Sequence, residues 1–240
     1  MSRSDTSDTL ERLLARKNGL AHEAAAAPLA RKLQELRTWQ AERLARTYAD
    51  LRRDPLTGEA VSFFLAELYG PQDFTQRDQN VGRAWRLLRR ALPARMLEVL
   101  SLAMELDVLS AELDLQMARR LDSGAISAQA YAEAYRAVGR PEARRRQIGL
   151  VFEIGTALVG AVRTPFVHLA LRAAHGPAHL AGFGVLQDFL ERGFAAFTQL
   201  PHPERFLEII KGRETRLMDI LMEGGTIPAE ESPPGAAGSS

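Results

Sequence analysis

The 240-residue chain contains no cysteine. Disulfides, thiolate metal sites, iron–sulfur clusters and cysteine nucleophiles are therefore excluded. An excess of one charge is also lacking, because 31 Lys and Arg residues oppose 30 Asp and Glu residues and leave a formal net charge of +1. Such a balance supplies no global attraction for nucleic acid or for an anionic membrane. We therefore expect no nucleic-acid partner.

Long apolar runs are scarce. The longest, residues 148–162, is about fifteen residues long and contains Glu153, whereas a membrane-spanning helix needs roughly 20 apolar residues. The first thirteen residues lack the apolar stretch of a secretory signal. These patterns predict a cytoplasmic protein without a membrane span.

The chain also lacks the common catalytic motifs. It has no glycine-rich phosphate loop and no G-x-S-x-G sequence. Neither Glu-x-x-His nor His-Glu-x-x-His occurs, so the usual helical di-iron and zinc motifs are missing. We therefore expect no catalytic residue, no metal and no cofactor, and a non-enzymatic role is favoured over catalysis.

The longest helical pattern covers residues 94–121, which contain no glycine and no proline. Two apolar stripes with steps of three and four run along it, on nearly opposite sides of one helix. A helix that is apolar on two sides lies between other elements, so the pattern predicts a central helix. The first stripe consists of Leu97, Leu100, Met104, Val108, Ala111, Leu115 and Ala118, and the second of Val99, Leu102, Leu106, Leu109, Leu113 and Met117.

Helical patterns fill most of the remaining chain, and no alternating strand pattern occurs. We expect Asn18-Gly19 to end the first helix and Gly176-Pro177 to break or kink a later one. The sequence thus predicts an all-α fold, a single globular bundle of eight to ten helices around the central helix. Residues 1–28 are expected to form a partly flexible helical arm, residues 29–223 the helical domain and residues 224–240 a disordered tail.

The most distinctive stretch is FFLAELYGPQDFTQRD at residues 63–78. With the stretch at residues 186–197, it resembles an uncharacterised family of bacterial all-helical proteins that has an FFLxxLYGPxDFxxRD-type signature. The resemblance covers residues 25–222 and implies a helical fold without an assigned activity. Arg77 and Asp78 flank an apolar stripe, where they form either an ion-pair network at a helix corner or a polar site at the edge of a pocket.

Three histidines, His168, His175 and His179, are spaced by seven and four residues. On an unbroken helix they would share one face, as metal ligands do. Because Gly176-Pro177 separates the last two, we favour structural roles for all three.

Two charged groups on neighbouring helices leave alternatives open. Glu98, Glu105 and Glu112 repeat every seven residues along the central helix. We favour a role as salt-bridge partners of arginines over a role as metal ligands or acid–base groups. The run Arg144-Arg145-Arg146 lies at the start of a helix, where cations oppose the helix dipole. The acidic row, an anionic ligand or solvent could offset that repulsion.

The region 141–200 is rich in glycine and phenylalanine. Glycines within helices allow helices to approach closely, or they leave room for an apolar ligand. Gly155, Gly160 and Gly182 are expected to face other helices. Candidate ligand-binding residues, in this region and at the corner described above, are Arg77, Asp78, Arg163, His168, Gly160 and Phe183.

The sequence favours a non-enzymatic helical protein that acts through protein–protein contacts, either self-association or recruitment of a partner. The alternative is a carrier or sensor of an apolar or amphipathic small molecule, bound between the glycine-rich helices of residues 141–200.

Overall fold

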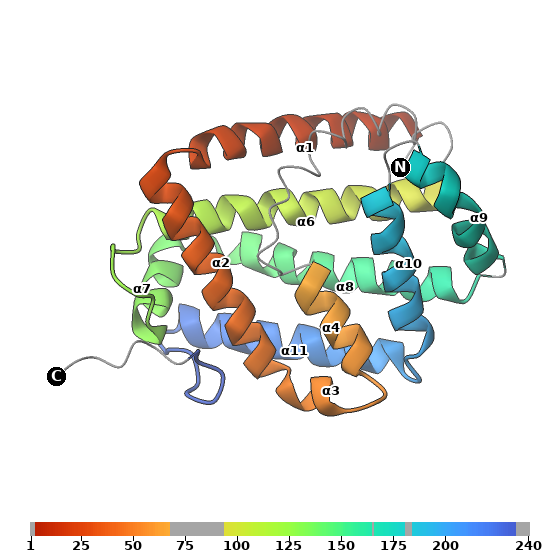
Figure 1. Ribbon diagram of the computed structural model, residues 1–240. Helices are drawn as coiled ribbons and strands as arrows, with labels where there is room; N and C mark the ends of the chain where they lie inside the picture. The colour runs from red at the N-terminus through yellow and green to blue at the C-terminus, as the bar shows by residue number, and fades with distance from the viewer. Residues whose placement is uncertain (1–2, 68–93, 165, 181–183, 234–240) are drawn as a thin grey trace.

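The computed structural model describes residues 3–67, 94–164, 166–180 and 184–233. These residues form ten helices and no strand (Figure 1), which confirms the predicted all-α bundle. Most of the distinctive stretch at residues 63–78 lies outside the described residues. In chain order the helices are α1 (Arg3–Ala24), α2 (Ala27–Thr47), α3 (Ala49–Arg53), α4 (Gly58–Glu67), α6 (Ala94–Ala118), α7 (Ala128–Val138), α8 (Pro141–Val162), α9 (Val167–Leu180), α10 (Gly184–Thr198) and α11 (Pro203–Met222).

Helix α6 is the central element of the bundle. Figure 1 shows it with α1 along one side and α8 along the other, and it also contacts α2 and α7. Met104, Val108 and Leu115 of the first predicted stripe pack with Leu20 of α1. On the opposite stripe Leu106, Leu113 and Met117 are buried, and Leu102 and Leu109 are partly buried. Both faces of α6 are therefore covered, as its two apolar stripes predict.

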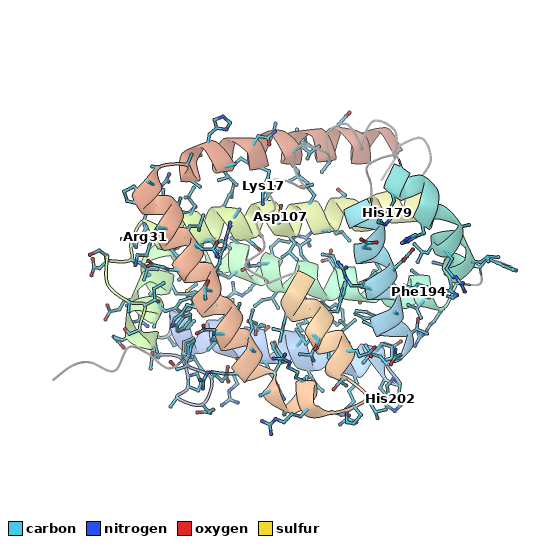
Figure 2. All side chains as sticks on the ribbon, viewed as in Figure 1. Lys17, Arg31, Asp107, His179, Phe194 and His202 are labelled. Atoms are coloured by element: carbon cyan, nitrogen blue, oxygen red, sulfur yellow. The ribbon has the colours of Figure 1, made fainter. Side chains whose placement is uncertain are left out.

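Helix α1 runs unbroken to Ala24, so the expectation that it ends at Asn18-Gly19 is wrong. Packing on α6 outweighs the weak helix propensity of these two residues, which is roughly 1 kcal/mol or less for each relative to alanine. Lys17 next to them is buried, and its Nζ lies 2.7 Å from Oδ2 of Asp107 on α6 (Figure 2).

The segment after α11 lies against the bundle. Ile227 is 2% exposed, within a cluster to which α2, α6, α7 and α11 contribute. Arg136 of α7 donates a hydrogen bond to the Gly225 carbonyl at 2.7 Å, and Thr47 of α2 donates to Glu231 at 2.6 Å. Contacts with the bundle thus extend to Glu231, and the boundaries predicted for the helical domain and the tail stay predictions.

Two glycines allow close approach between helices. A Cβ atom at Gly155 of α8 would lie 2.3 Å from Cδ2 of Leu207 on α11. One at Gly193 of α10 would lie 2.9 Å from the ring of Phe63 on α4. The expectation that Gly155 faces a neighbouring helix is therefore confirmed, while Gly160 is partly buried and Gly182 lies outside the described residues. The lack of a side chain at Gly155 therefore allows α8 to pack closely against Leu207 of α11.

Helix α9 continues through Gly176-Pro177, so the predicted break there is wrong. Its contacts are made mainly with the antiparallel helix α10, beside which it lies at one end of the bundle (Figure 1). These contacts outweigh the local preference of the Gly-Pro pair. One consequence is that His175 and His179 lie on the same face of one helix.

Among the described residues, no single helix is both long and apolar enough to cross a membrane. Residues Pro141–Val162 and Val167–Ala173 meet the requirement together, and they are bent by 95° relative to one another.

Candidate anion-binding cavity

A cavity of about 130 Å³ lies where α2, α6, α7, α8 and α11 meet. Its volume is close to the roughly 150 Å³ of an apolar cavity that accepts benzene, and well below the roughly 300–1,000 Å³ of pockets for drug-sized molecules. A single ring or a short chain therefore fits. The lining residues are Arg37, Gln40, Arg43, Leu44, Asp107, Ser110, Ala111, Asp114, Tyr131, Tyr135, Arg144, Gln147, Ile148, Val151, Phe152, Leu207, Ile210, Lys211, Glu214, Leu217, Met218 and Leu221.

One wall of the cavity is built by the tight turn between α7 and α8. The Ser127 side chain caps α7 by accepting a hydrogen bond from the Ala130 amide. Gly139 and Arg140 then both have positive φ, 66° and 58°, which reverses the chain before Pro141 starts α8. As a result the first turn of α8 folds back on the last turn of α7.

This reversal brings Arg144 of α8 onto Tyr135 of α7. The guanidinium carbon lies 4.2 Å from the centre of the tyrosine ring, a cation–π contact. Nη1 lies 3.4 Å from Oε1 of Gln147, and Nη2 lies 3.1 Å from the Met117 sulfur, a weak acceptor. Nε is buried and has no hydrogen-bond partner.

The burial of Arg144 is not matched by an acidic partner. The residue is 4% exposed, and no carboxylate of the described residues lies within ion-pair distance of it. Arginine stays protonated in proteins. A buried charge without a partner costs several kcal/mol, and the cation–π contact returns only about 2 kcal/mol of this. The cavity wall therefore carries a positive charge that a bound anion would neutralise.

The lining holds a second buried arginine, Arg43 of α2, which has a carboxylate partner although its Nε, like that of Arg144, has no hydrogen-bond partner. Its Nη1 and Nη2 donate to the two carboxylate oxygens of Glu214 on α11, at 2.8 and 3.0 Å. Tyr48 donates a further hydrogen bond to Glu214 at 2.8 Å. Burial acts to lower the pKa of Arg43, but the charge and hydrogen bonds of Glu214 outweigh it, so that pKa lies above its ordinary value.

The remaining charged groups of the lining also have contacts of their own. Asp107 pairs with Lys17, and Asp114 accepts a hydrogen bond from Gln40 at 3.1 Å and lies 3.7 Å from Arg37. Lys211 is exposed, with Nζ 4.8 Å from the centre of the Phe152 ring. Arg144 is thus a buried cation of this lining that has no carboxylate partner in the part of the chain that the structure describes.

Aromatic rings form the end of the cavity near α7. Tyr131 and Tyr135 lie with ring centres 6.0 Å apart, and Trp39 of α2 stacks on Tyr131 at 4.3 Å. Burial raises the pKa of the Tyr135 hydroxyl far above its usual range, so the phenol stays neutral. A flat apolar group can therefore pack on neutral rings beside a fixed positive charge.

Three of the residues predicted from the sequence as ligand contacts are described by the structure, and none of these three lines the cavity. Arg163 pairs with Glu204 at 2.6 Å, and exposed His168 stacks on Phe194 at 5.6 Å, both just beyond the C-terminal end of α8. Gly160, in the last turn of α8, is partly buried. Arg77, Asp78 and Phe183 lie outside the described residues, so their predicted roles stay predictions.

The three consecutive arginines of α8 have three different surroundings. Arg146 makes a bidentate pair with Glu105 of α6, at 2.8 and 2.9 Å. Arg145 is exposed and pairs with Glu142 of its own helix. Arg144 alone is buried. The salt-bridge interpretation of the acidic row is confirmed for Glu105, and for Glu112, which contacts Arg16 at 2.6 Å, whereas the Glu98 side chain is not among those described.

Sequence reasoning missed Arg43, Glu214 and Tyr135. A signal was present, because Arg43 falls on the apolar stripe of α2 that includes Leu36 and Glu214 falls between buried Ile210 and Leu217. Charged residues at such positions indicate a buried ion pair.

Comparison with known proteins adds a family but no activity. No curated protein and no solved structure matches the chain. A family model described as "Domain of unknown function (DUF8198)" matches residues 19–228, which includes every helix that lines the cavity. The chain therefore belongs to the DUF8198 family.

Proposed function

We propose that the protein binds a small organic anion in the cavity between α2, α6, α7, α8 and α11, and so acts as a carrier or sensor. The observation that supports this is Arg144, a buried cation on the cavity wall with no carboxylate partner among the described residues. This is the alternative expected from the sequence, binding of an apolar or amphipathic small molecule, whereas the favoured expectation, action through protein–protein contacts, stays a prediction. The proposed site differs from the expected one, because it uses α8 together with α2 and α11 and not with α9 and α10.

The ligand class follows from the lining. A carboxylate or similar group would accept hydrogen bonds from Nε and Nη2 of Arg144, the edge of a guanidinium that binds carboxylates in a bidentate manner. It would replace the weak contact between Nη2 and the Met117 sulfur. The ligand's apolar body would pack on Tyr135 and on aliphatic residues of α8 and α11. At about 130 Å³, the cavity favours anions of about the size of benzoate.

Calorimetric titration of the purified full chain with benzoate, acetate and inorganic phosphate tests the proposal. For a ligand of this size we expect a Kd of about 1 mM or lower for at least one anion, and for benzoate an affinity about tenfold above that of its neutral analogue benzamide. Arg144→Met should abolish the binding. Arg145→Met, one residue away but exposed, is the matched control and should bind as the parent chain does.

Two results would overturn the proposal. One is the absence of saturable binding of all three anions by the folded parent protein. The other is equal binding by the parent and the Arg144→Met protein, because the anion would then bind elsewhere.

A second candidate function is self-association. Phe166 and Leu169, at the start of α9, are 80% and 64% exposed, and apolar side chains gathered on a surface favour protein contacts. Sedimentation of the parent and of a Phe166→Ser/Leu169→Ser protein tests this function. A dimer that the double substitution dissociates would support it, whereas a monomeric parent at all concentrations would exclude it.

A further inference from the structure

Two histidines and two carboxylates face one another across the α9–α10 pair. Nε2 of His179 lies 3.0 Å from Oδ1 of Asp188, and Nδ1 of His175 lies 3.0 Å from Oε1 of Glu191. The two imidazole rings are 4.5 Å apart. Figure 2 shows His179 in the space between the two helices. The four side chains form a cluster that is separate from the cavity and from its residues.

The cluster depends on the continuity of α9. His175 and His179 are four residues apart, and Asp188 and Glu191 are three apart, so each pair lies on one face of its helix. Because α9 and α10 are antiparallel and adjacent in sequence, the two faces meet. A break at Gly176-Pro177 would have moved the histidines apart.

The spacing of the ligand atoms suits a small ion. One ligand atom each from His175, His179 and Asp188 can be chosen so that all three lie within 4.8 Å of one another. Around Zn²⁺, with bonds of roughly 2.0–2.1 Å to nitrogen and oxygen, tetrahedral ligand atoms are about 3.3 Å apart. Small side-chain rotations therefore bring the three atoms to bonding distance. The side chains are between 37% and 49% exposed, so an ion can enter.

We propose that His175, His179 and Asp188 bind a Zn²⁺ ion that fastens α9 to α10. Glu191 positions His175: it accepts a hydrogen bond from Nδ1, which leaves Nε2 for the metal, a common carboxylate–histidine–metal arrangement. Water occupies the remaining position. Two imidazoles and one carboxylate select a transition metal over Mg²⁺ and Ca²⁺, which prefer sites made only of oxygen.

The position of the site explains what an ion would add. Helix α9 has many exposed residues and contains a proline within its last two turns, a residue that strongly disfavours the interior of a helix. His175 and His179 stand on either side of that Gly-Pro pair. A metal bound to both residues and to α10 holds together the part of α9 that the sequence alone would break.

The test uses the full chain without an affinity tag. Competition with a chromogenic chelator should show one bound Zn²⁺ per chain, and Co²⁺ should give the intense visible absorption of a tetrahedral site. His179→Ala and Asp188→Asn should each weaken binding by at least tenfold, and Glu191→Gln by about 10–100-fold. His168→Ala is the matched control, because His168 is exposed on the same helix and outside the cluster.

The thermal midpoint provides an independent measurement. Zn²⁺ should raise it for the parent and for His168→Ala and leave it unchanged for His175→Ala/His179→Ala, whose helical content is checked by circular dichroism. Failure of the parent to bind Zn²⁺ and Co²⁺ saturably would overturn the proposal. Equal binding by the parent and the double variant would do the same, and if the double variant does not fold, Asp188→Asn decides by the same criterion.

Discussion

The two walls of the central cavity treat a buried arginine in opposite ways. Where α2 meets α11, Arg43 is held by both oxygens of Glu214, and Tyr48 completes the group. On the α7–α8 wall, Arg144 lies on a tyrosine ring, and its acceptors among the described residues are a glutamine oxygen and a thioether. On the α2–α11 wall, the positive charge of Arg43 is therefore paired with a negative charge within the protein. On the α7–α8 wall, the positive charge of Arg144 has no carboxylate partner among the described residues.

Under the proposed function, the α2–α11 wall serves the fold and the α7–α8 wall serves binding. A buried ion pair that is complete contributes little net stability, but removal of one partner is costly. A buried charge that is already unpaired should behave in the reverse manner, since its removal relieves a cost. Stability measurements can therefore separate the two walls without any knowledge of the ligand.

The largest effect is expected for Glu214→Ala, which leaves Arg43 buried without its carboxylate. We expect the free energy of unfolding to fall by about 3–5 kcal/mol, as measured by urea denaturation followed by circular dichroism. The double replacement Arg43→Met/Glu214→Met is the control and should recover most of that loss. A loss below about 1 kcal/mol for Glu214→Ala would mean that water replaces the carboxylate and that the two walls are alike.

Gly155→Ala tests the packing next to the cavity. The added methyl group would meet Leu207, which itself lines the cavity, and should lower the free energy of unfolding by about 1–3 kcal/mol through overpacking. Gly149→Ala, on the same helix with only a loose contact at 3.9 Å to Glu153, is the control and should not destabilise. A neutral Gly155→Ala would show that Leu207 moves into the empty cavity.

Arg144→Met should leave the free energy of unfolding of the ligand-free protein unchanged or raise it, by about 1–2 kcal/mol at most, because an uncompensated buried charge is removed. Thermal and urea unfolding of the parent and variant measure the difference. A loss of 2 kcal/mol or more would place Arg144 with Arg43, as a group that the fold needs.

The smallest change in the free energy of unfolding is expected for the exposed ion pair between Arg213 and Asp50, which lies near the buried Arg43–Glu214 pair. Arg213, next to Glu214 on α11, makes a bidentate contact with Asp50, and hydrogen bonds from Arg213 lower the pKa of Asp50 from 3.8 to about 2. The pair therefore stabilises the fold above pH 3.8, and this contribution is lost as the pH falls towards about 2. Because Asp50 is 59% exposed, we expect less than about 1 kcal/mol.

Comparison of the parent with Asp50→Asn measures that contribution. The variant should be slightly less stable at pH 7, and the difference should vanish near pH 2. A difference as large as that for Glu214→Ala would contradict the distinction between buried and exposed pairs.

The sequence predicted what local patterns determine. The two stripes of α6, the Ser127 cap and the Pro141 start of α8 follow from periodicity and capping within a few residues, and the structure has them. Two local rules failed, at Asn18-Gly19 and Gly176-Pro177, because contacts with α6 and α10 outweigh helix propensity there.

The cavity was beyond local rules. The arginine run at residues 144–146 stood out in the sequence, but nothing in it distinguishes Arg144. The burial of Arg144 depends on the reversal at Gly139-Arg140, and its lack of a carboxylate partner among the described residues depends on helices distant in the sequence. A metal site at His168, His175 and His179 was disfavoured because a break in α9 was expected, and the carboxylates of α10 were not considered with these histidines.

The Arg43–Glu214 contact joins residues 171 positions apart in the chain. Contacts between such distant residues carry a large loop-closure cost and slow the folding of proteins that depend on them. No short segment of the chain can form the cavity alone, because its walls come from α2 and α11 as well as from the helices between them. A ligand held there would bind the folded chain only, so it would stabilise the native state by an amount set by its concentration relative to its Kd.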